Sequence, residues 1–321
     1  MNYQNFLVVG GSGFVGRHLV AALAARGARV TVPTRRRDRA RQLILLPTVD
    51  VVEMDPRDHR ALALLAVGCD AVINLAGVLH SPRGTERGPN DYGPAFAEAH
   101  VEIPQALVSA CSEAGVKRLL HMSALGADAK APSEYLRSKA IGEQVVLAAE
   151  DLSTTVFRPS VIFGPEDLFL NRFAMLSTLF PVLALPYPDA RFQPVYVGDV
   201  ARAFLAALDD RASNGRIYKL CGPKEFTLRG LVEYVCHVTG RRRLVIGLPD
   251  WAADLQAWFL EQLPGPLLSR DNLKSMQVAS VCDCSFPFGL QPVALEAAAP
   301  AWLAHVNPRE RYPQLRWRAR R

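Results

Sequence analysis

The chain has 321 residues, half of them hydrophobic, which is enough for one large domain, or a domain with a smaller lobe, around a substantial core. Its formal net charge is +6, but residues 309–321 alone contain six arginines and one glutamate, so the rest of the chain is nearly neutral. A nucleic-acid-binding face needs Lys and Arg clustered across the folded body, so the composition argues against one.

Neither a membrane span nor a secreted protein is predicted. The best apolar stretch, residues 173–188, is too short to cross a bilayer and is interrupted by Pro181 and Pro186. No secretory signal precedes the first expected strand, and no pair of cysteines has CxxC spacing. We therefore expect a cytoplasmic protein with no metal site, whose cysteines are free thiols: Cys69, Cys111, Cys221, Cys236, Cys282 and Cys284.

The first half of the chain alternates short apolar runs with amphipathic segments, which is typical of βαβ units around a parallel sheet. The expected strands are residues 6–9, 29–32, 49–52, 71–74, 118–122 and 154–157. Helical spacing is found at residues 14–25, 58–66, 94–114 and 134–149. The predicted fold is α/β, a doubly wound parallel sheet of the Rossmann type.

The pattern changes after Arg158, where six prolines between positions 159 and 194 break up the sequence before a further helix over residues 198–208. We predict a dinucleotide-binding domain over residues 1–158, to which a segment of about 190–210 returns. Residues 159–321 then form mainly a smaller substrate lobe, ending in the basic tail 309–321.

A glycine-rich turn, GGSGFVG at residues 10–16, follows the first strand directly and opens the first helix. Glycines at such positions permit a tight turn, close approach of the backbone to a pyrophosphate, and close packing of the helix, whose N-terminus attracts the anion. A purely structural turn is the alternative. We expect a dinucleotide pyrophosphate to contact Gly10, Gly13, Phe14, Val15 and Gly16.

The end of the second strand carries arginines where an NAD-preferring site usually presents an acid to the ribose hydroxyls. Arg35 and Arg36 can pair with the 2′-phosphate of NADP, and no acid occurs before Asp38. A solvated basic segment is the alternative. The sequence favours NADP(H) over NAD(H).

Tyr135 and Lys139 lie four residues apart, and therefore on one face of the expected helix. A cation beside the phenol would lower its pKa and make Tyr135 a proton donor or acceptor for a carbonyl or alcohol. Lys139 would also hold the nicotinamide ribose. This spacing is common on surface helices. The catalytic interpretation therefore depends on the position of the helix, which follows the fifth strand.

These motifs together resemble the extended short-chain dehydrogenase/reductase superfamily. The stretch RPSVIFGPED at 158–167, FLNRF at 169–173 and YVGDVA at 196–201 look more closely like the NADPH-binding accessory subunit of respiratory complex I (alpha subcomplex) and its bacterial relatives. The resemblance covers most of the chain and is loose in the final thirty residues.

The resemblance implies further site residues. Asp55 would lie near the adenine, Ala76 and Gly77 would line the cofactor cleft, and Pro159 would border the nicotinamide. One departure concerns the end of the fifth strand, where Leu125 stands in place of a hydroxyl residue and cannot donate a hydrogen bond. Either Ser123 polarises the substrate from a shifted position, or the catalytic triad is incomplete.

Three functions remain open. The first is an NADP(H)-dependent oxidoreductase in which Tyr135, Lys139 and Ser123 act on a small, partly apolar substrate, because residues 169–183 are rich in large apolar side chains. The second is a non-catalytic nucleotide-binding accessory or assembly protein related to a complex I subunit. The third is a sugar-nucleotide epimerase or dehydratase. The arginines and Trp317 of the tail further suggest peripheral contact with an inner membrane.

Overall fold

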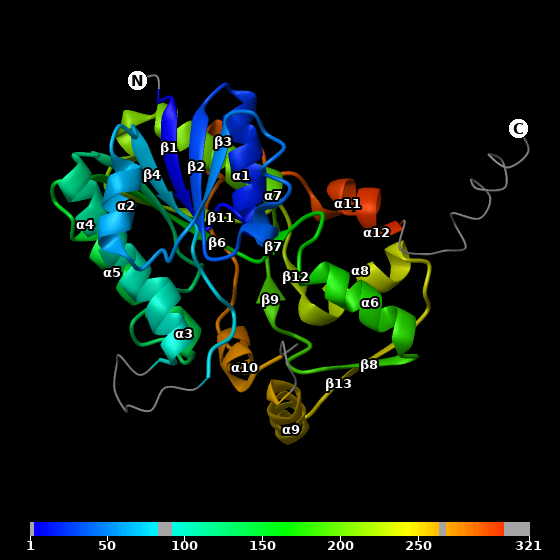
Figure 1. Ribbon diagram of the computed structural model, residues 1–321. Helices are drawn as coiled ribbons and strands as arrows, with labels where there is room; N and C mark the ends of the chain where they lie inside the picture. The colour runs from blue at the N-terminus through cyan, green and yellow to red at the C-terminus, as the bar shows by residue number, and fades with distance from the viewer. Residues whose placement is uncertain (1–2, 83–91, 263–267, 305–321) are drawn as a thin grey trace, which may run out of the picture. The chain divides into compact units, whose positions relative to one another are not determined.

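The computed structural model describes residues 3–82, 92–262 and 268–304, and the chain divides into two compact units (Figure 1). Unit 1 comprises Met1–Pro159, Val197–Leu220 and Asp283–Leu290. Unit 2 comprises Ser160–Tyr196, Cys221–Cys282 and Gln291–Arg321. The basic tail, for which the sequence suggests membrane contact, lies outside the described residues. Within those residues no helix is long and apolar enough to cross a membrane.

Unit 1 is built on a seven-stranded sheet in the order β11-β6-β5-β4-β1-β2-β3, with every neighbouring pair parallel. The strands are β1 (Asn5–Val9), β2 (Arg29–Thr34), β3 (Val49–Glu53), β4 (Ala71–Asn74), β5 (Arg118–Met122), β6 (Ser153–Pro159) and β11 (Arg216–Leu220). The six strands predicted from the sequence are all present. β11 was not predicted, and it extends the sheet at one edge.

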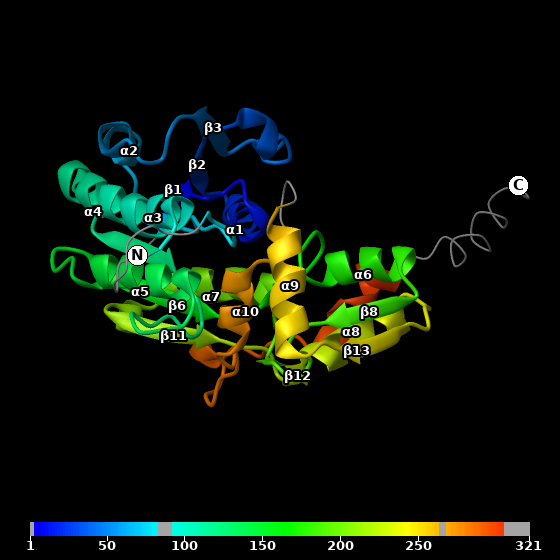
Figure 2. The same ribbon diagram turned by 90° about the horizontal axis from the view of Figure 1, so that it is seen from below.

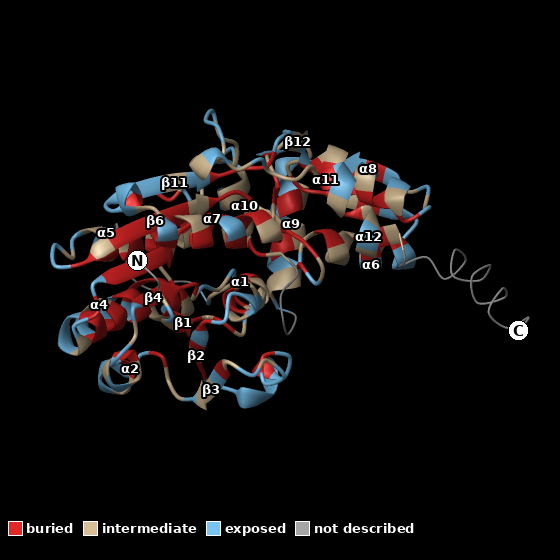
Figure 3. Ribbon diagram, turned by 90° about the horizontal axis from the view of Figure 1, so that it is seen from above, coloured by how far each residue is buried: buried red, intermediate tan, exposed pale blue. Residues whose placement is uncertain are grey.

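Helices cover both faces of this sheet, so the predicted doubly wound fold is confirmed (Figure 1). The helical elements of unit 1 are α1 (Phe14–Ala25), η1 (Arg37–Ala40), α2 (His59–Ala66), α3 (Pro94–Ala97), η2 (Glu98–Glu102), α4 (Ile103–Ala114), α5 (Glu134–Leu147), α7 (Val197–Asp209), η3 (Arg211–Ser213) and η4 (Pro287–Gly289). Helices α1 and α7 pack together, while α4 packs against both α2 and α5. The strands β1, β2, β4, β5 and β6 are almost continuously buried (Figure 3), as a parallel sheet covered on both faces requires, whereas the edge strands β3 and β11 each have one buried residue.

The helix predicted over residues 94–114 is interrupted by a π-helical turn, η2. Pro104 has no N–H to bond the carbonyl of His100 four residues earlier, so a regular α-helix cannot continue through this point. The released carbonyl approaches α5 closely, since a Cβ on Gly142 would lie only 1.8 Å from the His100 oxygen. The π turn and Gly142 together set how closely α5 packs on this segment.

Unit 2 combines short paired strands with helices around its own core. Its elements are β7 (Ile162–Phe163), α6 (Leu170–Leu179), β8 (Val182–Leu185), β9 (Arg191–Phe192), β10 (Val195–Tyr196), β12 (Phe226–Thr227), α8 (Leu228–Val238), β13 (Leu244–Gly247), α9 (Asp250–Glu261), α10 (Arg270–Met276), α11 (Leu295–Ala298) and α12 (Pro300–Leu303). Part of the apolar run at 169–183 joins this core, where Leu170 and Leu183 are buried, whereas Leu179 and Phe180 are exposed.

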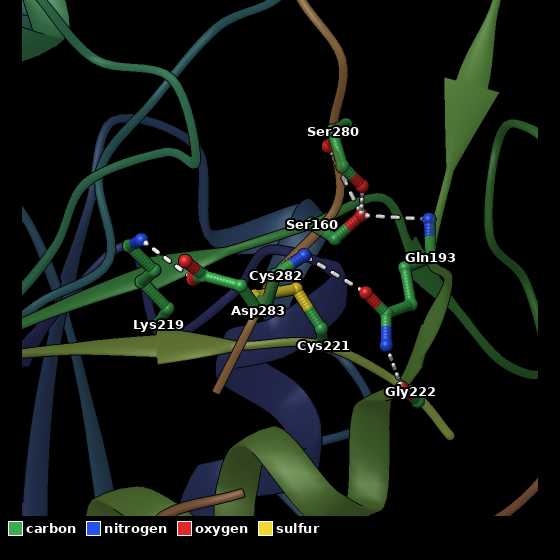
Figure 4. The surroundings of a disulfide bond; sticks show 8 residues. All are labelled: Ser160, Gln193, Lys219, Cys221, Gly222, Ser280, Cys282 and Asp283. Atoms are coloured by element: carbon green, nitrogen blue, oxygen red, sulfur yellow. Dashed lines mark hydrogen bonds and ion pairs between the residues drawn. A yellow bond between two sulfur atoms is a disulfide. The ribbon is translucent and has the colours of Figure 1, made fainter. Parts of the chain in front are cut away.

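The structure corrects the expectation that all six cysteines are free, because Cys221 and Cys282 form a disulfide within unit 2 (Figure 4). The Gln193 side chain links the two segments, accepting from the Cys282 N–H at 2.8 Å and donating to the Gly222 carbonyl at 2.7 Å. The partners are 61 residues apart, a separation for which chain-entropy arguments give a stabilisation of about 4 kcal/mol. Cysteine spacing therefore no longer supports a reducing compartment.

Candidate functional site

The turn between β1 and α1 lies against the carboxyl end of β4. Gly10 has a φ of +81°, and a Cβ there would come within 2.7 Å of the Leu75 carbonyl carbon. A Cβ on Gly16 would lie 2.3 Å from the Gly10 oxygen. Only glycine fits at either position, so the turn is held tightly between the strand and the helix.

The N-terminus of α1 follows this turn directly. Gly13 is exposed and occupies the cap position, so no side chain caps the helix, and its first turn has no acidic residue. The first-turn N–H groups, which include those of Phe14 and Val15, are suited to an anion. Val15 itself is buried in the sheet–helix core, so only its backbone is available to a ligand.

The end of β2 adjoins the glycine turn, where the Ser12 and Thr34 hydroxyl oxygens are 3.5 Å apart. The two arginines that follow are exposed and paired with carboxylates. Arg35 donates to Glu98 at 2.5 Å, and Arg36 binds Asp38 through two nitrogens at 3.1 and 2.7 Å. The hydrogen bond from Arg36 lowers the pKa of Asp38.

Asp55 follows β3 and is paired with Arg57 through bonds of 2.7–3.1 Å, which lower its pKa. Arg57 also lies 3.6 Å from Glu98, the partner of Arg35. Asp55 and Arg35 therefore belong to one exposed charged cluster at the ends of β2 and β3.

The Lys139 ammonium is buried at the carboxyl ends of β4 and β5. Nζ donates to the carbonyl oxygens of Ala76 at 3.3 Å and Met122 at 3.2 Å, and the residue is 3% exposed. Desolvation lowers its pKa from 10.5 to about 8. Within the described part of the chain its third N–H has no partner. A Cβ on Gly77 would lie 3.0 Å from Nζ, so a glycine keeps this approach open.

Tyr135 lies one turn before Lys139 on α5, as predicted. Its ring meets His100 and Phe96 edge-on, with centroids 5.4 and 6.0 Å away. The expectation that Lys139 lowers the phenol pKa is wrong, since desolvation raises it to about 12. The phenol is therefore neutral at neutral pH and suited to donating a proton.

The end of β5 holds two buried polar atoms without hydrogen-bond partners among the described residues, Ser123 Oγ and His121 Nε2. His121 Nδ1 accepts from the Asn74 side-chain amide at 3.1 Å, so Nε2 carries the proton. Burial and the nearby Lys139 lower the His121 pKa to about 3. An unsatisfied buried hydroxyl costs about 1–3 kcal/mol, which favours a ligand group here.

The loop after Ser123 turns toward β6. The Leu125 N–H donates to the Pro159 carbonyl at 2.9 Å, and Pro159 is buried at the end of β6. The Leu125 side chain offers no donor. Ser123 is therefore the one hydroxyl residue among positions 121–125.

His100 connects two segments of this site, and no motif in the sequence indicates that role. Its Nε2 accepts from the Val78 N–H at 3.1 Å, which leaves the proton on Nδ1 to donate to Ser138 Oγ at 2.8 Å. Burial, with Lys139 nearby, keeps the His100 pKa well below its ordinary value. The neutral ring thus ties the loop after β4 to α5, which carries Tyr135 and Lys139.

The sites follow one another along the carboxyl edge of the sheet. The arginines after β2 adjoin the glycine turn, the glycine turn touches the end of β4, and Lys139 bridges the ends of β4 and β5. The chain order reverses between β1 and β4, and in such sheets ligands bind at this switch point. The order of groups matches a dinucleotide extended from its ribose phosphate to its nicotinamide.

Residues 6–221 match the model of a protein family described as "NAD dependent epimerase/dehydratase family". The chain belongs to this family. It is an extended short-chain dehydrogenase/reductase with an NAD(P)-binding Rossmann fold, as the sequence resemblance predicted.

Two relatives are similar over most of their length. The mitochondrial NADH dehydrogenase (ubiquinone) 1 alpha subcomplex subunit 9 of Mus musculus is 31% identical over 97% of this chain and 81% of its own. The ceramide reductase of Caulobacter vibrioides is 32% identical over 76% of this chain and 73% of its own. Among solved structures, MoeE5 in complex with UDP-glucuronic acid and NAD shares the fold, with a TM-score of 0.63 at 22% identity over 76% of this chain and 85% of that one.

The buried ammonium of Lys139 predicts a pH-dependent stability. Its folded-state pKa of about 8 is below the ordinary 10.5, so between these values the unfolded chain binds more protons and stability rises with pH. Relative to Lys139→Met, the wild type should gain on the order of 3 kcal/mol in unfolding free energy across this window. Urea unfolding at pH values below and above this window measures the change in unfolding free energy.

The matched control is Lys130→Met, which removes an exposed lysine close to the same helix. For each variant, the difference in unfolding free energy from the wild type is followed with pH. If this difference changes with pH by the same amount for Lys130→Met as for Lys139→Met, the Lys139 ammonium is not desolvated.

Proposed function

We propose that the chain is an NADP(H)-dependent reductase of a carbonyl group on a partly apolar, lipid-like substrate. The observation that carries this proposal is the placement of a neutral phenol and a buried cation, Tyr135 and Lys139, on one helix beside the unpaired hydroxyl of Ser123. These three groups together can donate a proton to a substrate oxygen atom. They lie at the carboxyl edge of the sheet, where folds of this type bind dinucleotides.

The residues present fit a dinucleotide. The uncapped first turn of α1 suits a pyrophosphate, Gly77 and the third N–H of Lys139 suit a ribose hydroxyl, and the open Gly13 position lets a phosphate approach the backbone. When bound, the reduced cofactor would supply a hydride to the substrate carbon. Pro159 and Ala76 would border the nicotinamide side of the site.

The protein residues supply the proton and the polarisation. Tyr135 donates its phenolic proton to the carbonyl oxygen, and the Ser123 hydroxyl donates a hydrogen bond to the same oxygen. The Lys139 ammonium offers its remaining N–H to the ribose and so holds the cofactor in place beside the carbonyl group. His100 and Asn74 keep the surrounding backbone in place through the bonds to Val78 and Ala76.

The preference for NADP(H) rests on Arg35 and Arg36. Both are exposed and paired with carboxylates, and exposed ion pairs contribute little. A 2′-phosphate offers a doubly charged partner with several acceptor oxygens, so either guanidinium can exchange its carboxylate for the phosphate. Asp55 remains the expected neighbour of the adenine.

The substrate class is supported by a relative's name, since the relative in Caulobacter vibrioides is called a ceramide reductase. A second candidate is a non-catalytic nucleotide-binding accessory or assembly protein that contacts a respiratory complex. The similarity to the mitochondrial subunit over 97% of the chain supports it, as does Leu125 in place of a hydroxyl residue. For either function we propose a location at the periphery of an inner membrane.

The arginine pair predicts a cofactor preference. NADPH should bind more tightly than NADH by about tenfold or more, the value of one charge-assisted hydrogen bond. Replacing both residues, Arg35→Ala and Arg36→Ala, should weaken NADPH selectively, while Arg29→Ala at the opposite end of β2 should not. Titration calorimetry compares the cofactors, and equal wild-type affinities would refute the preference.

A Tyr135→Phe substitution separates catalysis from binding. Without the phenolic proton, reduction of a long-chain keto substrate should slow by about a hundredfold or more. NADPH affinity should stay nearly unchanged, because the cofactor contacts belong to Lys139 and the glycine turn. If the wild type binds NADPH but reduces no ketone, the accessory function is favoured. If the variant keeps the wild-type rate, Tyr135 is not the proton donor.

A further inference from the structure

Helix α9 of unit 2 turns its large apolar side chains toward solvent. Trp251 is 71% exposed, Leu255 58%, Trp258 49% and Phe259 61%. At 100° per residue these four positions form one stripe along the helix. The opposite face is buried through small residues, Ala253 and Ala257, against a cluster that includes Leu273. This is the reverse of an ordinary surface helix, which turns its large apolar side chains inward.

A second set of exposed apolar side chains lies next to the stripe. In β13, Val245 is buried in the unit 2 core, whereas Leu244 and Ile246 alternate with it and are 61% and 39% exposed. Gln256 of α9 donates to the Ala184 carbonyl of β8, the residue paired with Ile246. Figure 2 shows α9 beside β8 and β13.

We call the stripe together with Leu244 and Ile246 the unit 2 apolar surface. Contiguous exposed apolar surface of this kind marks an interaction site. Every exposed tryptophan or phenylalanine among the described residues belongs to unit 2, so this property separates it from unit 1.

The chemistry of the stripe fits a bilayer interface. Tryptophan is enriched where hydrocarbon meets headgroups, and amphipathic helices with Trp, Phe and Leu on one face lie in that plane. Twelve residues of helix extend about 18 Å, which suits a helix lying in the interface and is too short for one crossing the hydrocarbon. Of the three acidic side chains of α9, Glu261 pairs with Arg270, and Asp250 and Asp254 lie to one side of the stripe.

Positive charge accompanies this surface. Arg241, Arg242 and Arg243 directly precede Leu244, and Arg242 is exposed. These arginines would attract an anionic headgroup layer.

A second copy of the chain is the alternative partner. Arg241, Arg242 and Arg243, which directly precede Leu244, favour a bilayer instead. The same surface on a second copy would bring like charges together, whereas anionic headgroups complement them.

We propose that unit 2 docks on an anionic lipid bilayer through the unit 2 apolar surface, with α9 lying in the plane of the interface. Docking at this surface is independent of the reductase function and holds equally for a non-catalytic protein.

The test uses the full-length chain and vesicles of phosphatidylcholine mixed with phosphatidylglycerol. Cosedimentation should show binding of the wild type that weakens, but persists, as salt screens the arginines. The double variant Leu255→Gln/Phe259→Gln should bind roughly tenfold more weakly or worse, since it loses two inserted apolar side chains. The matched control is Leu64→Gln/Val67→Gln, which changes two residues of unit 1 that are 76% and 67% exposed and should bind like the wild type.

Tryptophan fluorescence with brominated phosphatidylcholine in the same vesicles supplies the second readout. Quenching of the wild type that disappears in Trp251→Phe/Trp258→Phe would place α9 in the lipid. The proposal is overturned if the wild type does not bind, or if the stripe variant binds as the wild type does. It is also overturned if a chain ending at Ala304 loses all binding with the stripe intact, or if the stripe variant dissociates a dimer and leaves vesicle binding unchanged.

Discussion

The site depends on one buried cation. Lys139 is held by two carbonyl oxygens: that of Ala76, two residues beyond the end of β4, and that of Met122, the last residue of the adjacent strand β5. Such strands bring their carboxyl ends to one edge of the sheet, so a lysine on the following helix can bridge them. Desolvating the ammonium costs stability, and the lowered pKa records this cost. An ammonium with one unused N–H in a nearly dry setting is in turn well placed to bind a polar ligand.

The geometry around the cation is fixed by backbone contacts that glycine and proline make possible. Pro104 breaks the helical hydrogen bonding and produces the π turn, and Gly142 lets α5 approach the released carbonyl of His100. The His100 ring then joins the Val78 backbone to Ser138 on α5. The packing that orients Tyr135 and Lys139 therefore begins in a segment of the chain far from either residue.

Features with a local signature could be predicted from the sequence. Alternating apolar runs predicted six of the seven strands, and the glycine turn was placed because tight turns and close helix packing require glycine at Gly10 and Gly16. The spacing of Tyr135 and Lys139 gave their common helix face. β11 was missed because only Leu220 is fully buried in a strand that lies at the sheet edge.

Features that arise from distant parts of the chain could not be predicted. The Cys221–Cys282 bridge joins residues 61 apart, and the Asn74–His121 pair forms only when β4 and β5 align. The pKa of Tyr135 was expected to fall because its neighbour in sequence is a cation. It rises because tertiary packing desolvates the phenol. Likewise, the pairing of Arg35 with Glu98 depends on the π turn that carries Glu98.

The central claim is that the carboxyl edge from the glycine turn to Lys139 binds a nicotinamide dinucleotide. Hydrogen exchange of the full chain, followed by mass spectrometry with and without NADPH, tests it most directly. We expect slower exchange in peptides that cover residues 10–17 and 75–78, where we propose that the backbone contacts the pyrophosphate and the ribose. Unchanged exchange in both segments at saturating NADPH would contradict it.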